Sequence, residues 1–410
     1  MATARSCCAA LWLAGSWSWV GAQEANAVLT FESAWDLALR SHPDLRASAL
    51  EREAAEGATR QAGAWPNPEL SALLEDTRRE TRTTTWQVSQ PIELGGKRAA
   101  RARVAHSAQQ QAESDLLARQ AQVKAQLLVA FRGLAVAQEK RRLADELGRL
   151  ASRAREVVSK RVASGKVSPV EEVKAKVAEA QSRSALAGVH GEWRVARQQL
   201  VMALGDPTLS FDKIDGHLEQ LPSLLAWAGI DARIAASPAL SRARQEIQRR
   251  EALTEVERAK GTPDVTVSLG VKRDQQVGHT QPLLGVSLAL PLFDRRQGAL
   301  LEASRLEDKA RAEQDALQAK LTAQATEAFE QLSTALALVQ ALREEVLPGA
   351  RQALEAATKG YDMGKFGFMD MLDAQRTLFD AETQALAATA QAFRADARLL
   401  ELLGDVVTTP

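Results

Sequence analysis

The chain has 410 residues, of which 45% are hydrophobic and 25% charged, and its 52 basic and 52 acidic residues give a net charge of zero. A balanced charge removes any argument from composition for binding nucleic acid or an acidic membrane surface. Aromatic residues make up only 4%, with a single tyrosine. This composition is typical of long packed helices rather than of a compact mixed fold.

Residues 1–22 are predicted to form a secretory signal peptide. Arg5 supplies a short positive region, an apolar stretch from Cys7 to Val20 follows, and Ala22 ends a plausible cleavage site. A buried N-terminal helix is the alternative reading. Both cysteines, at positions 7 and 8, lie inside this leader, so the exported chain would contain neither a disulfide nor a reactive thiol. No other apolar run is long enough to predict a transmembrane helix.

The remaining sequence is an internal duplication with a spacing of about 200 residues. We expect a first repeat over 23–205, a connector over 206–230, a second repeat over 231–405 and a tail over 406–410. Each repeat is predicted to be a helix, a β-hairpin and a long helical hairpin. The matching segments are Ser41–Leu45 with Ser237–Leu240, Pro66–Leu70 with Thr262–Val265, Gln90–Leu94 with Leu290–Phe293, Gly165–Lys166 with Gly364–Lys365, and Leu204–Asp206 with Leu403–Asp405.

Long helices follow the hairpins, over 97–205 in the first repeat and 298–404 in the second. The segment from Lys97 to Val162 has no proline and would extend roughly 100 Å as a helix. Pro348 is expected to bend or break its counterpart. The apolar spacing predicts coiled-coil seams. The seam positions are Leu143, Leu147, Leu150, Ala154 and Val157 in the first repeat and Leu332, Leu336, Val339, Leu342 and Val346 in the second.

The hairpins, over 67–95 and 263–293, contain four strands of about ten residues in which apolar and polar side chains alternate. Strands of that length and pattern can cross an outer membrane as part of a barrel with a watery lumen. A soluble sheet with one buried face is the alternative. Four strands cannot close a membrane barrel, and lipid does not tolerate open sheet edges. If the strands enter a membrane, several chains must therefore share one barrel.

These features together resemble the TolC-like outer membrane factors, most closely their CzcC-type heavy-metal efflux branch. The resemblance covers essentially the whole exported chain. Its most branch-specific part is the Gln-Pro-x-Glu-Leu-Gly-Gly-Lys-Arg stretch. The residues that carry it are Asn67–Leu70, Ser89–Arg98, Pro291–Phe293 and Asp370–Gln375.

The resemblance implies a mainly helical fold with membrane β-structure. Three chains would close a 12-stranded barrel in the outer membrane of a Gram-negative bacterium and a 12-helix tunnel in the periplasm. A periplasmic adaptor and an inner-membrane pump of the resistance-nodulation-division type would be its partners. Asp370 and Asp373 match acidic residues that ring the family's periplasmic entrance, and Tyr361 matches a residue that holds it closed. The basic partner expected beside that tyrosine is Phe366 here.

Each entrance candidate also has a plainer interpretation. Asp370 and Asp373 are also explained as helix N-terminal charges favoured by the helix dipole. The turn residues Gly165, Lys166, Gly364 and Lys365 are either adaptor contacts, as the family's docking implies, or solvated helix tips.

The predicted function is a passive exit duct for heavy-metal cations of the cobalt, zinc and cadmium class or the copper class. Drugs or secreted proteins are the alternative cargo, and a periplasmic adaptor or a purely structural coiled coil is a less favoured kind of protein. The sequence predicts no enzyme, no cofactor and no tight metal site. The five histidines are scattered, and no known metal or phosphate motif is complete.

Overall fold

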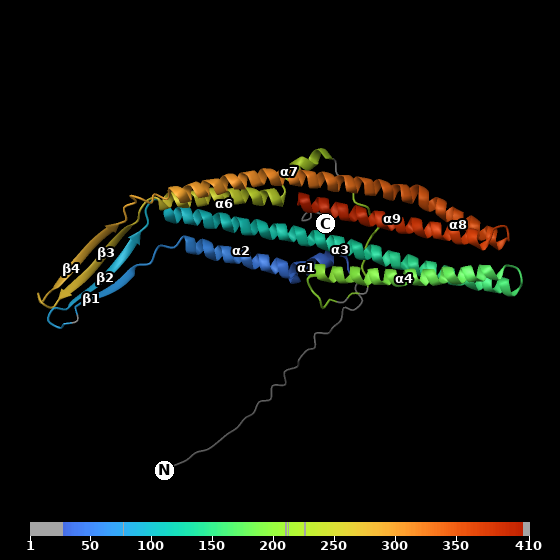
Figure 1. The fold of residues 1–410 in the computed structure, drawn as a ribbon, viewed down its shortest axis with the longest axis horizontal. Helices are drawn as coiled ribbons and strands as arrows, with labels where there is room; N and C mark the ends of the chain where they lie inside the picture. Colours follow the sequence, from blue (N-terminus) through green and yellow to red (C-terminus); the bar gives the residue numbers. More distant parts are fainter. Residues whose placement is uncertain (1–27, 77, 210, 212, 225–226, 405–410) are drawn as a thin grey trace, which may run out of the picture.

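The computed structural model describes residues 28–404, except for 77, 210, 212 and 225–226. The molecule is elongated, with a β-sheet at one end and two helix-to-helix turns at the other (Figure 1). The predicted signal peptide and the 406–410 tail lie outside the described residues. Among the described helices, none is long and apolar enough to span a membrane.

The first repeat runs from the middle of the molecule to the sheet, along the whole length to the far tip, and back. Thr30 caps its first helix and Ser168 its last, each through a side-chain oxygen that accepts a backbone N–H. The elements are α1 (Phe31–Ser41), α2 (Pro43–Ala62), β1 (Glu69–Glu75), β2 (Thr83–Ile92), α3 (Lys97–Ala163) and α4 (Pro169–Leu204).

The second repeat follows the same path (Figure 1). Ser237 caps its longer entry helix, and Pro238 occupies the first turn, where a missing N–H costs nothing. The elements are a 3₁₀ turn (Trp227–Gly229), α5 (Ile230–Ala235), α6 (Pro238–Lys260), β3 (Val265–Asp274), β4 (Thr280–Leu288), α7 (Gln297–Ala341), a π-helical segment (Leu342–Val346), α8 (Leu347–Asp362) and α9 (Phe368–Leu403).

The π-helical segment lies next to Pro348, which occupies the first turn of α8. Proline cannot donate the backbone hydrogen bond that a continuous α-helix requires at this position. The long helix of the second repeat is thus interrupted where Pro348 was expected to disturb it.

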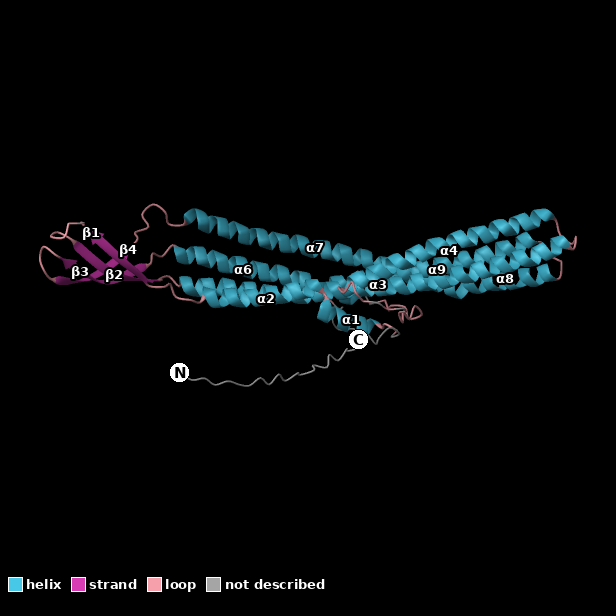
Figure 2. Cartoon of the chain, turned by 90° about the horizontal axis from the view of Figure 1, so that it is seen from below, coloured by secondary structure: helices cyan, strands magenta, loops and turns pink. Residues whose placement is uncertain are grey.

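The helix α3 is the central element of the bundle, packing against α2 and α6 near the sheet and against α4 and α9 farther away. Two equivalent cores lie near the middle of the molecule. One surrounds Leu127, Phe131 and Leu200 in the first repeat, and the other surrounds Leu332 and Leu399 in the second. Figure 2 shows the helices continuing as a narrow bundle on both sides of this region.

The predicted seam of α3 is only partly right. Leu143 is buried, but Leu150 and Val157 are 45% and 42% exposed, and Ala151 and Val158 are buried instead. The buried row is shifted because α3 packs against α9 as well as α4 in this part of the bundle. In the second repeat, Leu332, Val339 and Leu342 are buried as expected, whereas Val346 is 45% exposed.

The four strands form one antiparallel sheet in the order β1-β2-β3-β4. The two hairpins are joined by pairing of β2 with β3, with Val88 opposite Leu269. β3 extends to Asp274, and its residues Lys272 to Asp274 pair with Thr85 to Thr83 of β2. Within the described residues, β1 and β4 each pair with one strand only, so both edges of the sheet are open.

Candidate functional site

One face of the sheet carries an unbroken row of apolar side chains. The register places Leu70, Val88, Leu269 and Leu284 side by side across all four strands. Leu284 is 76% exposed and Leu70 67%. No helix or loop among the described residues covers this row, so the face fits contact with lipid rather than with a protein core.

The opposite face is small and polar. Glu69, Ser89, Ser268 and Gly285 lie across the four strands, and the hydroxyl oxygens of Ser89 and Ser268 are 3.1 Å apart. An apolar face and a polar face on one sheet confirm the period-two pattern of the sequence. Such a sheet can separate lipid from water once its edges are paired.

At the far end of the molecule, the two helical hairpins turn in the same way. Gly165 and Gly364 have φ angles of 70° and 72°, a left-handed conformation that glycine adopts without steric cost. The N–H of Lys166 donates to the carbonyl of Arg161, and the N–H of Lys365 donates to that of Gly360, at 2.9 and 2.8 Å. Both lysines are exposed, so the duplicated sequence produces two cationic tips at the same end.

Tyr361 connects the two tips. Its side chain is 5% exposed and packs edge-on against Phe368, with ring centroids 6.1 Å apart. The guanidinium carbon of Arg161, near the end of α3, lies 4.2 Å from the centre of the Tyr361 ring. The same guanidinium donates to the Tyr361 carbonyl at 3.2 Å and lies 3.9 Å from a carboxylate oxygen of Asp362. Burial raises the pKa of the Tyr361 hydroxyl, while Arg161 opposes this shift.

The sequence reasoning missed Arg161 because it searched for the basic partner beside Tyr361 in the chain. Phe366 does stand at the expected position, and its ring covers Gly360, where an added Cβ would come within 2.1 Å of it. The repeats carried a usable signal. Equivalent positions of the two repeats are 199 residues apart here, so Arg161 of the first hairpin corresponds to Gly360 of the second. The first hairpin therefore has an arginine where the second has a glycine, next to Tyr361.

Asp370 and Asp373, the two aspartates predicted to lie at the entrance, are in the first two turns of α9. An Asp370 carboxylate oxygen accepts the backbone N–H of Gly367 at 2.8 Å, which caps the helix. Asp373 is exposed, and its carboxylate has no hydrogen-bond or ion-pair partner among the described residues. The plainer interpretation thus accounts for part of the role of Asp370. It does not account for Asp373.

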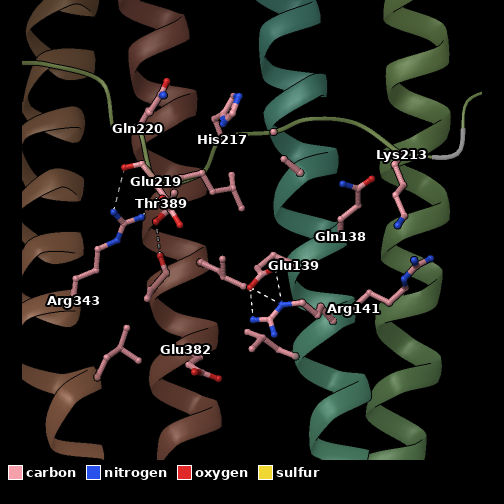
Figure 3. Close-up of a pocket in the computed structure, with 18 of the residues that line it drawn as sticks. Gln138, Glu139, Arg141, Lys213, His217, Glu219, Gln220, Arg343, Glu382 and Thr389 are labelled. Atoms are coloured by element: carbon pink, nitrogen blue, oxygen red, sulfur yellow. Dashed lines mark hydrogen bonds and ion pairs between the residues drawn. The ribbon is translucent and has the colours of Figure 1, made fainter. Parts of the chain in front are cut away.

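A hollow of about 970 Å³ lies midway along the bundle, under the connector (Figure 3). The connector crosses it as a strap that is bonded through its backbone. Arg132 of α3 donates to the carbonyls of Gly216 and His217, and Arg343 of the π-helical segment donates to those of Leu218 and Glu219. The strap thus ties the first repeat to the interrupted helix of the second.

Arg132 also lies near the half-buried carboxyl of Asp396 on α9. Its guanidinium carbon lies 4.7 Å from the centre of the Phe393 ring. Burial raises the pKa of the Asp396 carboxyl to about 6, and the charge of Arg132 only partly offsets this effect. Burial lowers the pKa of Arg132 for the same reason. The two groups lie on α3 and α9 and interact electrostatically without a direct ion pair. Arg132 and Phe393 also line a hollow of about 910 Å³ together with His42, Asp44 and Glu401.

No group of three or more histidine, cysteine, aspartate or glutamate side chains in the described residues is arranged to hold a metal ion. The surfaces that stand out are therefore the two-faced sheet and the linked helical tips.

Comparison with known proteins assigns these features to a family. The model of the outer membrane efflux protein family matches residues 34–206 and 230–405. The chain belongs to this family of outer-membrane channels. Its two matched segments closely follow the two repeats.

Among curated proteins, the chain is 42% identical over 382 residues to the cobalt-zinc-cadmium resistance protein CzcC of Cupriavidus metallidurans, covering 93% of this chain and 91% of the relative. It is 29% identical over 307 residues to the nickel and cobalt resistance protein CnrC of the same organism, covering 72% of this chain and 71% of that protein. The likeness to the first extends over nearly the full length of both chains.

Solved structures share the fold at low sequence identity. A membrane protein from Pseudomonas aeruginosa matches with a TM-score of 0.80 at 20% identity, covering 91% of this chain and 92% of its own. The open state of the Neisseria gonorrhoeae MtrE outer membrane channel matches with a TM-score of 0.77 at 17% identity, covering 91% and 88%. The predicted fold class is confirmed by this likeness.

Proposed function

We propose that three copies of this chain assemble into an outer-membrane exit duct. The observation that carries the proposal is the four-stranded sheet, which has one apolar face, one polar face and two open edges. Pairing β4 of one copy with β1 of the next removes every edge and turns the apolar faces outward. Three copies supply twelve strands, and their helices continue the duct as a tunnel into the periplasm.

The proposed cargo is heavy-metal cations. The support is the 42% identity to a protein named for cobalt, zinc and cadmium resistance. A duct of this kind needs no tight coordination site, because strong binding slows release. Drugs or secreted proteins remain the alternative cargo.

The proposed partners are a periplasmic adaptor and an inner-membrane pump of the resistance-nodulation-division type. The exposed turns at Gly165–Lys166 and Gly364–Lys365 are the proposed adaptor contacts. They share one backbone geometry and lie at the end of the molecule farthest from the sheet (Figure 1). A partner that contacts both tips meets two similar cationic turns per copy.

The function is tested by growth of a strain that lacks this chain on zinc, cobalt, cadmium, copper and antibiotics. We expect sensitivity to one or more of the metals, restored by the intact chain, with unchanged tolerance to antibiotics. Sensitivity to antibiotics alone would overturn the metal assignment and favour the alternative cargo. The native mass of the protein extracted in detergent provides the structural control, and a monomer would contradict the shared barrel.

The acidic entrance has its own test, because Asp370 has two roles to separate. The double variant Asp370→Asn with Asp373→Asn removes both charges, and asparagine oxygen can still accept the Gly367 N–H. We expect the preference for cations over anions in lipid-bilayer recordings to fall by a factor of roughly two to five, since the carboxylates together contribute on the order of 1 kcal/mol per passing ion in a water-filled pore screened by salt.

The matched control is Glu313→Gln with Asp315→Asn, which removes two exposed acids from α7, far from the tips. It should leave ion preference unchanged. If the entrance variant and the intact channel had the same ion preference, Asp370 would keep only its capping role and Asp373 would have no role in ion selection.

A further inference from the structure

The junction between the sheet and the long helices exposes several large apolar side chains. Phe293 is 93% exposed, Leu290 69% and Leu292 65%, all on the segment that joins β4 to α7. Trp65, on the segment that joins α2 to β1, is 62% exposed. Exposing such a cluster of apolar side chains to water is unfavourable, so we expect a partner to cover the junction.

Cations lie directly beside these apolar groups. The guanidinium carbon of Arg98 lies 4.1 Å from the centre of the Trp65 ring. Arg295 and Arg296 follow Phe293, and their guanidinium groups form no ion pair among the described residues. The first turns of α3 and α7 contain no acidic residue, and Asp294, which accepts the backbone N–H of Arg296 at 2.8 Å, offsets only one of the three arginine charges. In a chain whose net charge is zero, the junction is locally basic.

A hollow of about 800 Å³ at the junction is lined by both apolar and charged side chains. Its apolar lining includes Leu290, Leu292 and Phe293. Its charged lining consists of Lys97, Lys260, Asp264, Asp294 and Arg296, and Lys260 is paired with Glu257 outside the hollow. Lys97 is already paired with Asp264 at 2.7 Å, which leaves Arg296 as the cation available to a ligand. An occupant of this hollow must therefore present an anionic head and an apolar body.

We propose that this junction, here called the collar, binds the headgroups of anionic phospholipids and fixes how deeply the sheet enters the membrane. The collar consists of Trp65, Arg98, Leu290, Leu292, Phe293, Arg295 and Arg296. The proposal rests on the proposed function, because it requires the sheet to lie in a bilayer. Aromatic rings and arginines both favour the boundary between acyl chains and phosphates, and an anionic headgroup matches the unpaired arginines in charge.

The strand directions make the collar continuous in an assembly. β1 begins at the helix side of the sheet and β4 returns to it, so Trp65 and Phe293 both lie at that end (Figure 1). When β4 of one copy pairs with β1 of the next, Phe293 of the first copy and Trp65 of the second come to the same level. The collar then surrounds the duct where the membrane ends and the tunnel begins.

The experiment is native mass spectrometry of the full-length assembly in detergent, titrated with phosphatidylglycerol or with phosphatidylcholine. We expect tighter binding of phosphatidylglycerol, and roughly tenfold weaker binding of that lipid in the variant Arg295→Gln with Arg296→Gln, with phosphatidylcholine unaffected. Phe293→Ser, a second variant, should weaken both lipids. The control Arg305→Gln with Lys309→Gln removes two exposed cations from α7 and should change neither.

Equal binding of the two lipids, or an unchanged affinity in the arginine variant, would overturn the collar. Displacement of phosphatidylglycerol by inorganic phosphate at matched concentration would assign the arginines to a free anion and overturn it as well. These failures are distinguishable from failure of the proposed function, which would appear in the same spectra as an intact protein that does not form trimers.

Discussion

Replacing Arg161 with alanine is expected to raise the resting conductance of the assembled channel roughly tenfold or more. Arg161 joins α3 to the end of α8 through the face of the Tyr361 ring, the Tyr361 carbonyl and Asp362. The cation–π contact and the charged hydrogen bond together contribute about 2–4 kcal/mol per copy, while the exposed contact with Asp362 contributes little. Losing that much stabilisation shifts the balance between closed and open entrances toward the open one.

Single-channel recordings in planar lipid bilayers measure the effect. Lys160→Ala is the matched control, because it removes one exposed positive charge from the preceding residue and should leave the conductance low. Tyr361→Phe keeps the ring and should also stay low, whereas Tyr361→Ala should conduct like Arg161→Ala. Arg161→Lys should give an intermediate value, since lysine keeps the charge but lacks the planar guanidinium. Equal conductance of Arg161→Ala and Lys160→Ala would refute the link.

Replacing Gly205 or Gly404 with alanine is expected to cost roughly 2–4 kcal/mol of stability each. Both glycines end a long helix with a φ angle near 75°, at 73° and 77°, which strains any residue with a Cβ. A Cβ on Gly205 would also lie 2.7 Å from the His42 Cα, and one on Gly404 would lie 2.5 Å from the Pro238 Cδ. Because the two glycines occupy equivalent positions of the two repeats, 199 residues apart, we expect the two variants to lose similar amounts of stability.

Thermal unfolding in detergent checks this expectation, with Tm lowered by several degrees in both variants. Gly188→Ala is the control on the same helix as Gly205. An added Cβ there meets nothing within 4 Å, and alanine is favoured over glycine inside a helix by about 1 kcal/mol, so Tm should rise or stay unchanged. A Tm of Gly205→Ala equal to that of Gly188→Ala would mean that the helix end tolerates the strain.

The periodic features of this chain were accessible without a structure. The alternation in the hairpins predicted a sheet with one apolar and one polar face. The matched Gly165 and Gly364 predicted two similar turns, and both adopt the left-handed conformation. Ser168, Pro169 and Glu171 are local helix-start signals, and Ser168 does cap α4. Such features depend on residues close together in the chain, so a single sequence contains them.

The contacts between distant segments were not accessible in the same way. Arg161 and Tyr361 are 200 residues apart, and the repeat spacing relates Arg161 to the neighbouring Gly360 without indicating that the two side chains meet. The pairing of β2 with β3 and the exposure of Leu150 depend on how the two repeats pack together. The sequence by itself determined the repeats, the strand and helix periods and the family. The tertiary structure decided which side chains of one repeat face the other, because that choice follows from packing rather than from local spacing.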